Sequence, residues 1–294
     1  MVKVLISGAT GFIGSNLAKR LIKENAEVHI LARGTSSLKV LGDIPVIVHR
    51  HDGTTGKMLE IFQSAKPAIV FHIAAKFVAE HQSQDVEELV KSNLLFGAQL
   101  LEAMSITNVR HLICAGTSWQ HFEQESYNPV NLYAATKQAF EDLAAYYVRS
   151  GSIKMVTLKL LDTYGPNDPR QKLFALFEYI SNSGERLKMS QGEQLLGLVY
   201  IDDVIEAFIA AGSLIETLPD FKILSYTLAP DHCYSLKEVA AIYEQVSGKH
   251  LNIGWGERTY RKREVMRPHI GIRLPNWKAK VSLVDGIKKC LKNN

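Results

Sequence analysis

The sequence predicts an α/β protein in which a doubly wound parallel sheet is covered by helices on both faces, with a smaller lobe interleaved toward its C-terminal part. Short apolar runs alternate along the chain with segments whose apolar residues recur at helical spacing. Strands that read as continuous apolar runs are buried on both faces, because each crossover helix covers one side of a parallel sheet. The 294 residues, 46% of them hydrophobic, suffice for one large unit or two joined domains.

The predicted elements follow in order from the N-terminus. A strand at 2–7 leads through a glycine turn to a helix at 12–23, and a second strand follows at 27–32, which makes a βαβ unit. Further strands are expected at 45–48, 68–72, 111–115 and 154–160, and helices at 57–64, 86–105 and 133–149.

The regular alternation ends after residue 160. Residues 164–171 are rich in Pro, Gly, Asn and Asp, a helix is expected at 173–181, and 198–211 returns to a strand and a helix. The second lobe therefore interrupts the sheet domain instead of following it. The expected division is a sheet domain over 1–160 and 198–228, and a second lobe over 161–197 and 229–294.

Composition and charge exclude several classes of protein. The 34 basic and 30 acidic residues leave a formal charge of +4 without a block of like charges, which argues against a nucleic-acid partner. The N-terminal segment reaches Gly8 and Thr10 after few apolar residues, and no window is apolar enough for a membrane span, so a cytoplasmic protein is expected. Cys114, Cys233 and Cys290 lie far apart and lack ligand spacing, which predicts reduced thiols and no metal site.

The first turn carries the pattern GxxGxxG between a strand and the helix that it opens. Glycines at such a turn let the backbone approach a pyrophosphate, whose charge is bound by free N–H groups at the helix N-terminus. This context predicts that the sheet domain binds a dinucleotide and that the second lobe binds the substrate. The cofactor-binding candidates in the turn are Gly8, Thr10, Gly11, Phe12, Ile13 and Gly14.

The end of the second strand indicates which dinucleotide is bound. A fold that prefers NAD should offer an acid there for the ribose 2′-hydroxyl, but residues 31–37 contain Arg33 and no carboxylate. A guanidinium suits a 2′-phosphate, so NADP(H) is favoured over NAD(H). Further cofactor-binding candidates at the ends of later strands are Asp52, Ala74, Ala75, Lys76 and Leu160.

A tyrosine and a lysine lie one helical turn apart at Tyr133 and Lys137, so both side chains emerge on one face of the helix. An ammonium beside a phenol lowers the phenol pKa and makes it a usable proton donor or acceptor. The spacing alone is not specific. Thr117, however, ends the preceding strand at the carboxyl edge of the sheet, where open α/β folds bind ligands.

The glycine turn, Thr117 and the Tyr/Lys pair, in this order, resemble the extended short-chain dehydrogenase/reductases that act on nucleotide sugars. The resemblance covers essentially the whole chain and includes two late signatures, Tyr164-Gly165-Pro166 and Tyr200-Ile201-Asp202-Asp203. It implies a Rossmann fold, a nucleotide-sugar substrate and catalysis by Thr117, Tyr133 and Lys137. It also implies that Asn93 is the polar helix position of the active site, counted with the cofactor-binding residues. A homodimer is expected through the helix of Tyr133 and its neighbour, with Phe140, Leu143, Tyr146 and Tyr147 either as contacts or as core residues of the same chain.

The residues after Thr117 reduce the number of reactions that the resemblance allows. Dehydratases of the family carry Asp and Glu there, whereas this chain has Ser118 and Trp119, which leaves a reductase or an epimerase. Residues 161–172 and 261–266 look most like the CDP-abequose and CDP-paratose synthase group, which reduces a CDP-linked 4-keto-6-deoxy sugar with NADPH for O-antigen. The substrate-binding candidates are Ser118, Asp162, Lys172 and Arg261.

Two adjacent positions depart from the family pattern. The family usually places Arg-Asp just before the second late signature, to grip the substrate diphosphate, and this chain has Leu196 and Gly197. Three hypotheses therefore stand at this point. The leading one is an NADPH-dependent reductase, the second is a nucleotide-sugar epimerase with tightly bound cofactor and no net redox, and the third is a non-catalytic NADP-sensing protein.

Overall fold

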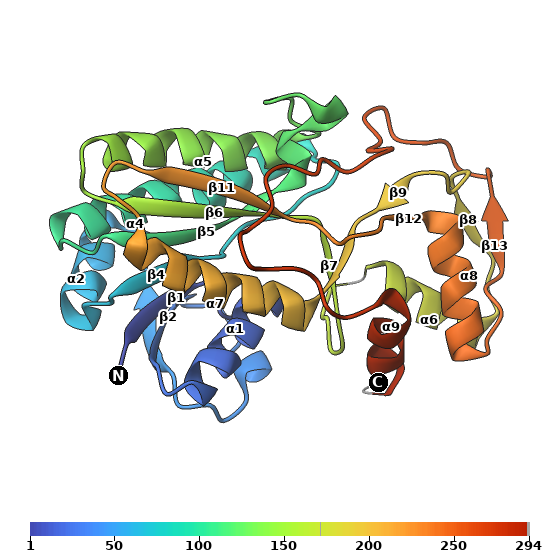
Figure 1. The fold of residues 1–294 in the computed structure, drawn as a ribbon, viewed down its shortest axis with the longest axis horizontal. Coiled ribbons are helices and arrows are strands. Elements are labelled where there is room, and N and C mark those ends of the chain that lie inside the picture. The colour runs from blue at the N-terminus through green and yellow to red at the C-terminus, as the bar shows by residue number, and fades with distance from the viewer. Residues whose placement is uncertain (171, 293–294) are drawn as a thin grey trace.

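A seven-stranded parallel sheet forms the centre of the molecule. The computed structural model describes residues 1–170 and 172–292. The strands are β1 (Lys3–Ser7), β2 (Glu27–Arg33), β3 (Ile47–His51), β4 (Ile69–His72), β5 (His111–Thr117), β6 (Lys154–Leu160) and β11 (Ile223–Leu228). Their order is β11-β6-β5-β4-β1-β2-β3, so the chain winds outward from β1 in both directions (Figure 1). The predicted doubly wound parallel sheet is confirmed.

Helices cover both faces of the sheet and bury a core on each. On one face, α1 (Phe12–Lys23) and α7 (Ile201–Thr217) pack on Ile6 and its neighbours. On the other, α2 (Thr55–Ala65), α4 (Phe96–Ile106) and α5 (Leu132–Arg149) pack on Leu5 and its neighbours. Adjacent residues of β1 thus enter opposite cores, because successive side chains of a strand point to opposite faces.

Several predicted elements have different bounds in the structure, and in two of them the difference has a clear origin or changes the element itself. The third strand begins at Ile47, after Pro45, which has no N–H to donate to a neighbouring strand. The long helix predicted at 86–105 consists of α3 (Val86–Val90), a π-helical turn, η3 (Lys91–Leu95), and α4. Single 3-10 turns lie at Lys39–Leu41, Ser83–Asp85, Ser118–Gln120 and Phe122–Gln124.

A second group of elements lies beyond the carboxyl ends of the sheet (Figure 1). It contains three two-stranded pairs and three helices, and its helices lie at the opposite end of the molecule from α2. The pairs are β7 (Asp162–Tyr164) with β10 (Leu198–Tyr200), β9 (Leu195–Leu196) with β12 (Tyr234–Ser235), and β8 (Leu187–Met189) with β13 (Ile253–Trp255), and the helices are α6 (Leu173–Ser183), α8 (Leu236–Ser247) and α9 (Leu283–Lys292). The division into two domains stays a prediction.

Asp203 connects α7 to the C-terminal part of the chain. Its buried carboxylate accepts the backbone N–H groups of Lys280 (3.0 Å) and Val281 (2.9 Å), and its carbonyl accepts the indole N–H of Trp277 (2.8 Å). The last aspartate of the second late signature therefore anchors the segment that leads to α9. Among the described residues, no helix is long and apolar enough to cross a membrane, and no three metal-ligating side chains gather into a metal site.

Candidate functional site

A cavity of about 1120 Å³ opens at the carboxyl ends of the central strands. This is the edge at which open α/β sheets bind ligands. Most of the predicted site residues line it, whereas Asn93 and Arg261 do not. The predicted residues that line it are Gly8, Thr10, Gly11, Phe12, Ile13, Gly14, Arg33, Asp52, Ala74, Ala75, Lys76, Thr117, Ser118, Tyr133, Lys137, Leu160, Asp162 and Lys172.

The glycine turn forms a cradle with room for a pyrophosphate. Gly8 has a φ of +79°, and a Cβ there would lie 2.6 Å from the backbone nitrogen of Ala74. A Cβ on Gly14 would lie 2.2 Å from the carbonyl oxygen of Gly8. The helix α1 then begins with no side-chain cap and no acidic residue in its first turn. Its first N–H groups therefore suit an anion, which fits a bound dinucleotide.

Two arginines line this cavity where β2 and β3 end, which we call its adenosine side because a dinucleotide on the glycine turn would place its adenosine there. The side chain of Arg33 is 73% exposed, and its Nη1 lies 3.5 Å from a carboxylate oxygen of Glu88. Sequence reasoning missed Arg50, whose Nη1 donates to the backbone carbonyls of Arg33 (2.6 Å) and Ser36 (3.2 Å). Arg33, Arg50 and Glu88 all line the cavity. Arg50 thus holds the backbone of the loop that follows β2, and Arg33 at the start of this loop is exposed.

Asp52 lies at the same side, just after β3. Its carboxylate accepts hydrogen bonds from the backbone N–H (2.9 Å) and the hydroxyl (2.8 Å) of Thr54, and these bonds lower its pKa. Thr54 in turn caps α2 by accepting the N–H of Lys57. Asp52 is therefore an ionised, fixed acceptor at the cavity wall.

Thr117, Tyr133 and Lys137 lie at the other side of the cavity. Thr117 ends β5, and Tyr133 and Lys137 lie one turn apart on α5, as the sequence predicts. The helix begins there because the side-chain carbonyl oxygen of Asn131 accepts the N–H of Ala134 (2.9 Å).

The expected lowering of the Tyr133 pKa by Lys137 is not found. Burial raises the pKa of Tyr133 to about 12, because the phenolate loses its hydration, and burial also lowers the pKa of Lys137. No compensating effect of the Lys137 ammonium on the phenol is found among the described residues. The phenol is therefore held in its protonated form.

Asn93 lies behind the cavity wall and connects two parts of it. Its side chain is almost completely buried, and its amide bonds both the N–H (2.7 Å) and the carbonyl (3.0 Å) of Lys76. The same amide donates to the Thr136 hydroxyl (2.9 Å), which donates to the carbonyl of Tyr133 (2.7 Å). The π-helical turn η3 carries Asn93, in line with the frequent occurrence of such turns at functional sites.

Positive charge on the second-lobe side of the cavity comes from Arg170 and Lys172. Arg170 is held by Asp168 (2.6 and 2.7 Å) with its guanidinium 4.7 Å from the ring of Phe12. Burial lowers the pKa of Lys172. Arg261, by contrast, lies outside the cavity lining, with its Nε 3.2 Å from a carboxylate oxygen of Glu80.

The Cα of Gly197 packs against the side chain of Leu161, which would have to move to admit a side chain at this position. A Cβ at this position would lie 2.1 Å from a methyl carbon of Leu161, and the Gly197 carbonyl accepts the N–H of Asp162 (3.1 Å). Leu196 pairs with Tyr234 in the β9–β12 ladder. The two residues that depart from the family pattern thus lie beside Tyr234 and the side chain of Leu161, next to Asp162.

Two aromatic side chains that the predicted site did not include line the cavity beside Tyr133. The ring of Phe77 meets that of Tyr133 edge to face at 5.0 Å and lies 5.7 Å from the ring of Trp119. Phe77 is 52% exposed, so part of its apolar surface faces open space. This wall favours an apolar substituent on a bound ligand.

Comparison with known proteins identifies the family to which the chain belongs. The family model described as "NAD dependent epimerase/dehydratase family" matches residues 4–224. A CDP-abequose synthase of Yersinia pseudotuberculosis is 29% identical over 269 residues, which cover 91% of this chain and 92% of that protein. The structure of a UDP-glucose 4-epimerase of Thermus thermophilus in complex with NAD has a TM-score of 0.83 at 24% identity, over 99% of this chain and 98% of that one. The chain therefore belongs to the NAD-dependent epimerase/dehydratase family and is an enzyme of the extended short-chain dehydrogenase/reductase type.

Proposed function

We propose that this enzyme reduces a nucleotide-linked 4-keto-6-deoxy sugar, with a CDP-linked sugar favoured, and oxidises NADPH in the same reaction. The observation that carries the proposal is the single cavity that joins the glycine cradle and Arg33 to Thr117, Tyr133 and Lys137. The similarity to CDP-abequose synthase over nearly the whole length of both chains supports the substrate class.

The preference for NADPH rests on the charges at the adenosine side. Arg33 and Arg50 place two guanidinium groups on the cavity wall, and a guanidinium binds phosphate with two parallel hydrogen bonds. Glu88 lies beside Arg33 and competes for it, but residues 31–37 contain no carboxylate that would accept from a ribose 2′-hydroxyl.

The chain's own residues supply the proton and the charge stabilisation. When bound, the reduced nicotinamide supplies a hydride for the carbonyl carbon of the sugar. Tyr133 gives its phenolic proton to the carbonyl oxygen, and its raised pKa keeps that proton in place until the oxygen becomes basic. The Thr117 hydroxyl donates a hydrogen bond to the same oxygen. Lys137, which lies one turn further along α5 and lines the same cavity, would hold the nicotinamide ribose.

The substrate side supports a reductase over a dehydratase. Ser118 and Trp119 follow Thr117 where dehydratases of the family carry the Asp and Glu that eliminate water. Arg170 and Lys172 supply cations for a diphosphate in place of the arginine missing at Leu196. Phe77 and Trp119 offer an apolar wall that suits the methyl group of a deoxy sugar.

A homodimer through α4 and α5 belongs to the same proposal. Leu143 is 40% and Tyr146 70% exposed, whereas Phe140 is buried in the core of its own chain. Tyr147 donates to Glu102 on α4 (2.8 Å), so it joins the two helices within one chain. The interface should therefore be built on Leu143 and Tyr146. Sedimentation equilibrium of the parent and of Tyr146→Arg tests this, because loss of dimer is expected only in the variant.

The experiment that tests the reaction follows nicotinamide absorbance after CDP-4-keto-6-deoxyglucose is added to the purified protein with NADPH and, separately, with NADH. Oxidation of NADPH with formation of the 4-hydroxy sugar is expected. A changed sugar without oxidation, together with cofactor that co-purifies, would instead identify an epimerase. No reaction of either kind would refute this substrate class.

A further inference from the structure

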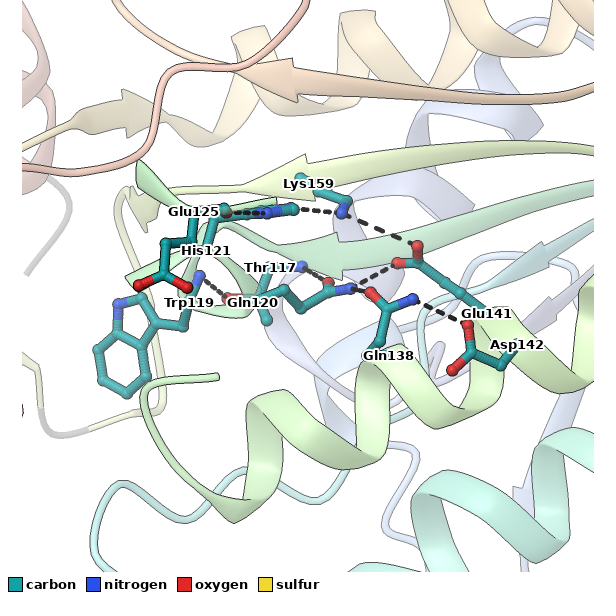
Figure 2. A network of polar contacts seen from close by, with 9 residues as sticks. All are labelled: Thr117, Trp119, Gln120, His121, Glu125, Gln138, Glu141, Asp142 and Lys159. Atoms are coloured by element: carbon teal, nitrogen blue, oxygen red, sulfur yellow. Dashed lines mark hydrogen bonds and ion pairs between the residues drawn. The ribbon is translucent and has the colours of Figure 1, made fainter. Parts of the chain in front are cut away.

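A chain of buried polar contacts begins at the backbone of Thr117 (Figure 2). Gln120 is the last residue of the 3-10 turn Ser118–Gln120, which follows β5 directly, and its side chain is completely buried. Its Oε1 accepts the N–H of Thr117 (3.0 Å), while its Nε2 donates to Oε1 of Gln138 (2.8 Å) and to Oε1 of Glu141 (3.0 Å). One amide therefore links the end of β5 to α5.

The orientation of this amide is determined by its partners. Gln138 donates its own Nε2 to a carboxylate oxygen of Asp142 (3.0 Å), so its Oε1 faces Gln120 as an acceptor. Glu141 offers a second acceptor to the same Nε2. A flipped Gln120 amide would set its oxygen against two acceptors and its NH2 group against the N–H of Thr117. Only one orientation satisfies all three contacts.

Charges behind Gln120 hold Glu141 in place. Lys159 on β6 is nearly buried, and its Nζ lies 3.8 Å from Oε2 of Glu141, whose side chain is only 15% exposed. The same ammonium contacts Nε2 of His121, whose Nδ1 lies 3.1 Å from the carbonyl of Glu125. The carboxylate that accepts from Gln120 is thus compensated by a lysine on the strand next to β5.

The turn that Gln120 closes also sets the hydrogen bonding of the Thr117 hydroxyl. Oγ1 of Thr117 accepts the backbone N–H of Trp119 (3.2 Å) within this turn. A hydroxyl has one hydrogen and two lone pairs. Because the N–H of Trp119 occupies one lone pair, the turn favours the hydroxyl as a donor toward a ligand in the cavity that Thr117 lines.

We propose that Gln120 is a positioning residue for the reduction, which keeps the Thr117 hydroxyl in the donor orientation toward the substrate carbonyl, and that Glu141 and Lys159 hold Gln120 in the required orientation. Gln120 does not line the cavity and touches no reacting atom. Its effect must therefore pass through Thr117. This inference rests on the proposed function, because it assumes that Thr117 stabilises the developing oxyanion.

The test is a double-mutant cycle between Gln120→Met and Thr117→Val, read as kcat and KM with NADPH and the keto sugar. Loss of a well-placed oxyanion donor costs about 100-fold or more, so a partial loss of its orientation in Gln120→Met should lower kcat about tenfold with the KM for NADPH unchanged. In the Thr117→Val background the same change should lower kcat less than about twofold. Gln194→Leu is the matched control, because Gln194 is a buried glutamine bonded to Ser190 away from the cavity, and it should leave kcat unchanged.

The outcomes separate this inference from the proposed function. If Thr117→Val itself retains full turnover, the assigned role of Thr117 fails. If Thr117→Val is slow but Gln120→Met lowers kcat equally in both backgrounds, or has no effect, the positioning role is overturned and the network is structural only.

Gln120→Glu provides a second test should the methionine variant fail to fold. It keeps the size of the side chain and an acceptor for the N–H of Thr117, but it sets a second carboxyl against Glu141. The other titratable groups that face this network are Lys159, Lys137, His121, His269 and Asp142. Two adjacent buried carboxyls share a proton, which restores a donor toward Glu141 at low pH. The kcat of Gln120→Glu relative to the parent should therefore rise as the pH is lowered, and a ratio independent of pH would contradict the proposal.

Discussion

Nη1 of Arg50 donates to the backbone carbonyl of Arg33 at 2.6 Å, so the arginine near the end of β3 fixes the loop that presents the arginine at the end of β2. The two side chains therefore have different roles. Arg33 is exposed and can move to a phosphate, whereas Arg50 uses a donor to hold the backbone of the loop. Cofactor selection is expected to depend on both, but through separate effects.

Arg33→Ala should weaken the binding of NADPH and leave the binding of NADH unchanged. Removal of one charge-assisted contact to a phosphate costs about 1.5–3 kcal/mol, which corresponds to a rise of about 10- to 100-fold in the KM for NADPH. Lys39→Ala removes an equal charge from an exposed position just beyond the same loop, outside the cavity lining, and serves as the control. Equal losses for NADPH and NADH would contradict a role for Arg33 in the recognition of the 2′-phosphate.

Tyr133→Phe should abolish proton donation without disturbing the cavity. The hydroxyl alone is removed, and the ring keeps its edge-to-face contact with Phe77. We expect turnover to fall by about 100-fold or more, since a positioned general acid contributes that much, while the affinity for NADPH stays within about twofold. Stopped-flow turnover and fluorescence titration of NADPH measure the two quantities. Retained turnover would show that another group donates the proton.

Asn93→Ala should destabilise the protein and slow turnover together. The substitution leaves the N–H of Lys76 and the hydroxyl of Thr136 without their buried partner, which costs about 1–3 kcal/mol for each unsatisfied group. Urea unfolding measures the loss, and kcat reports the displacement of Tyr133. Asn182→Ala, at an exposed position where the amide oxygen accepts from Lys249, should change neither quantity appreciably.

Much of the site follows from local sequence, and the rest depends on contacts between distant segments. The glycine turn and the Tyr133/Lys137 face could be predicted because helical spacing and strand–turn–helix order are local. Arg50 could not, since its contact with the loop after β2 depends on the register in which Ala32 pairs with Arg50. Arg261 was placed at the site on resemblance, and its pairing with Glu80 was not visible in the sequence.

The raised pKa of Tyr133 could not be predicted from local sequence either. Spacing brings Lys137 to the same helix face, but the phenol pKa depends on how completely the surrounding chain removes water, which no local pattern records. The π-helical turn that carries Asn93 is a comparable case, because its sequence continues the helical pattern without a break.

His72 should make the stability of the fold sensitive to acid. It is completely buried and bonded through Nδ1 to the Ser7 hydroxyl (2.7 Å), and burial lowers its pKa from 6.5 to about 3. Between pH 6.5 and about 3, His72 binds a proton in the unfolded chain but not in the folded chain. The free energy of unfolding therefore decreases as the pH is lowered through this range, by up to ~1.4 kcal/mol per pH unit.

Asparagine does not titrate, so unfolding of the His72→Asn variant should take up about one proton fewer than unfolding of the parent in this pH range. The variant is expected to be less stable than the parent at pH 7. Urea unfolding at about pH 7, 6 and 5 measures the slope in each protein. His81→Asn changes an exposed histidine and should leave the slope as in the parent. Identical slopes in the parent and in His72→Asn would mean that His72 does not contribute to acid sensitivity.

Two glycine substitutions should act in opposite directions. Gly8→Ala forces a Cβ to within 2.6 Å of the Ala74 backbone at a φ of +79°, so we expect a loss of about 2 kcal/mol or more of stability together with loss of NADPH binding. Gly56 lies in the first turn of α2 with open space around it, and Gly56→Ala should raise the free energy of unfolding by up to about 1 kcal/mol. Urea unfolding and NADPH titration of both variants measure these effects. Because the cradle binds phosphate through its backbone, normal NADPH affinity in a folded Gly8→Ala protein would refute the assignment of this turn to the cofactor.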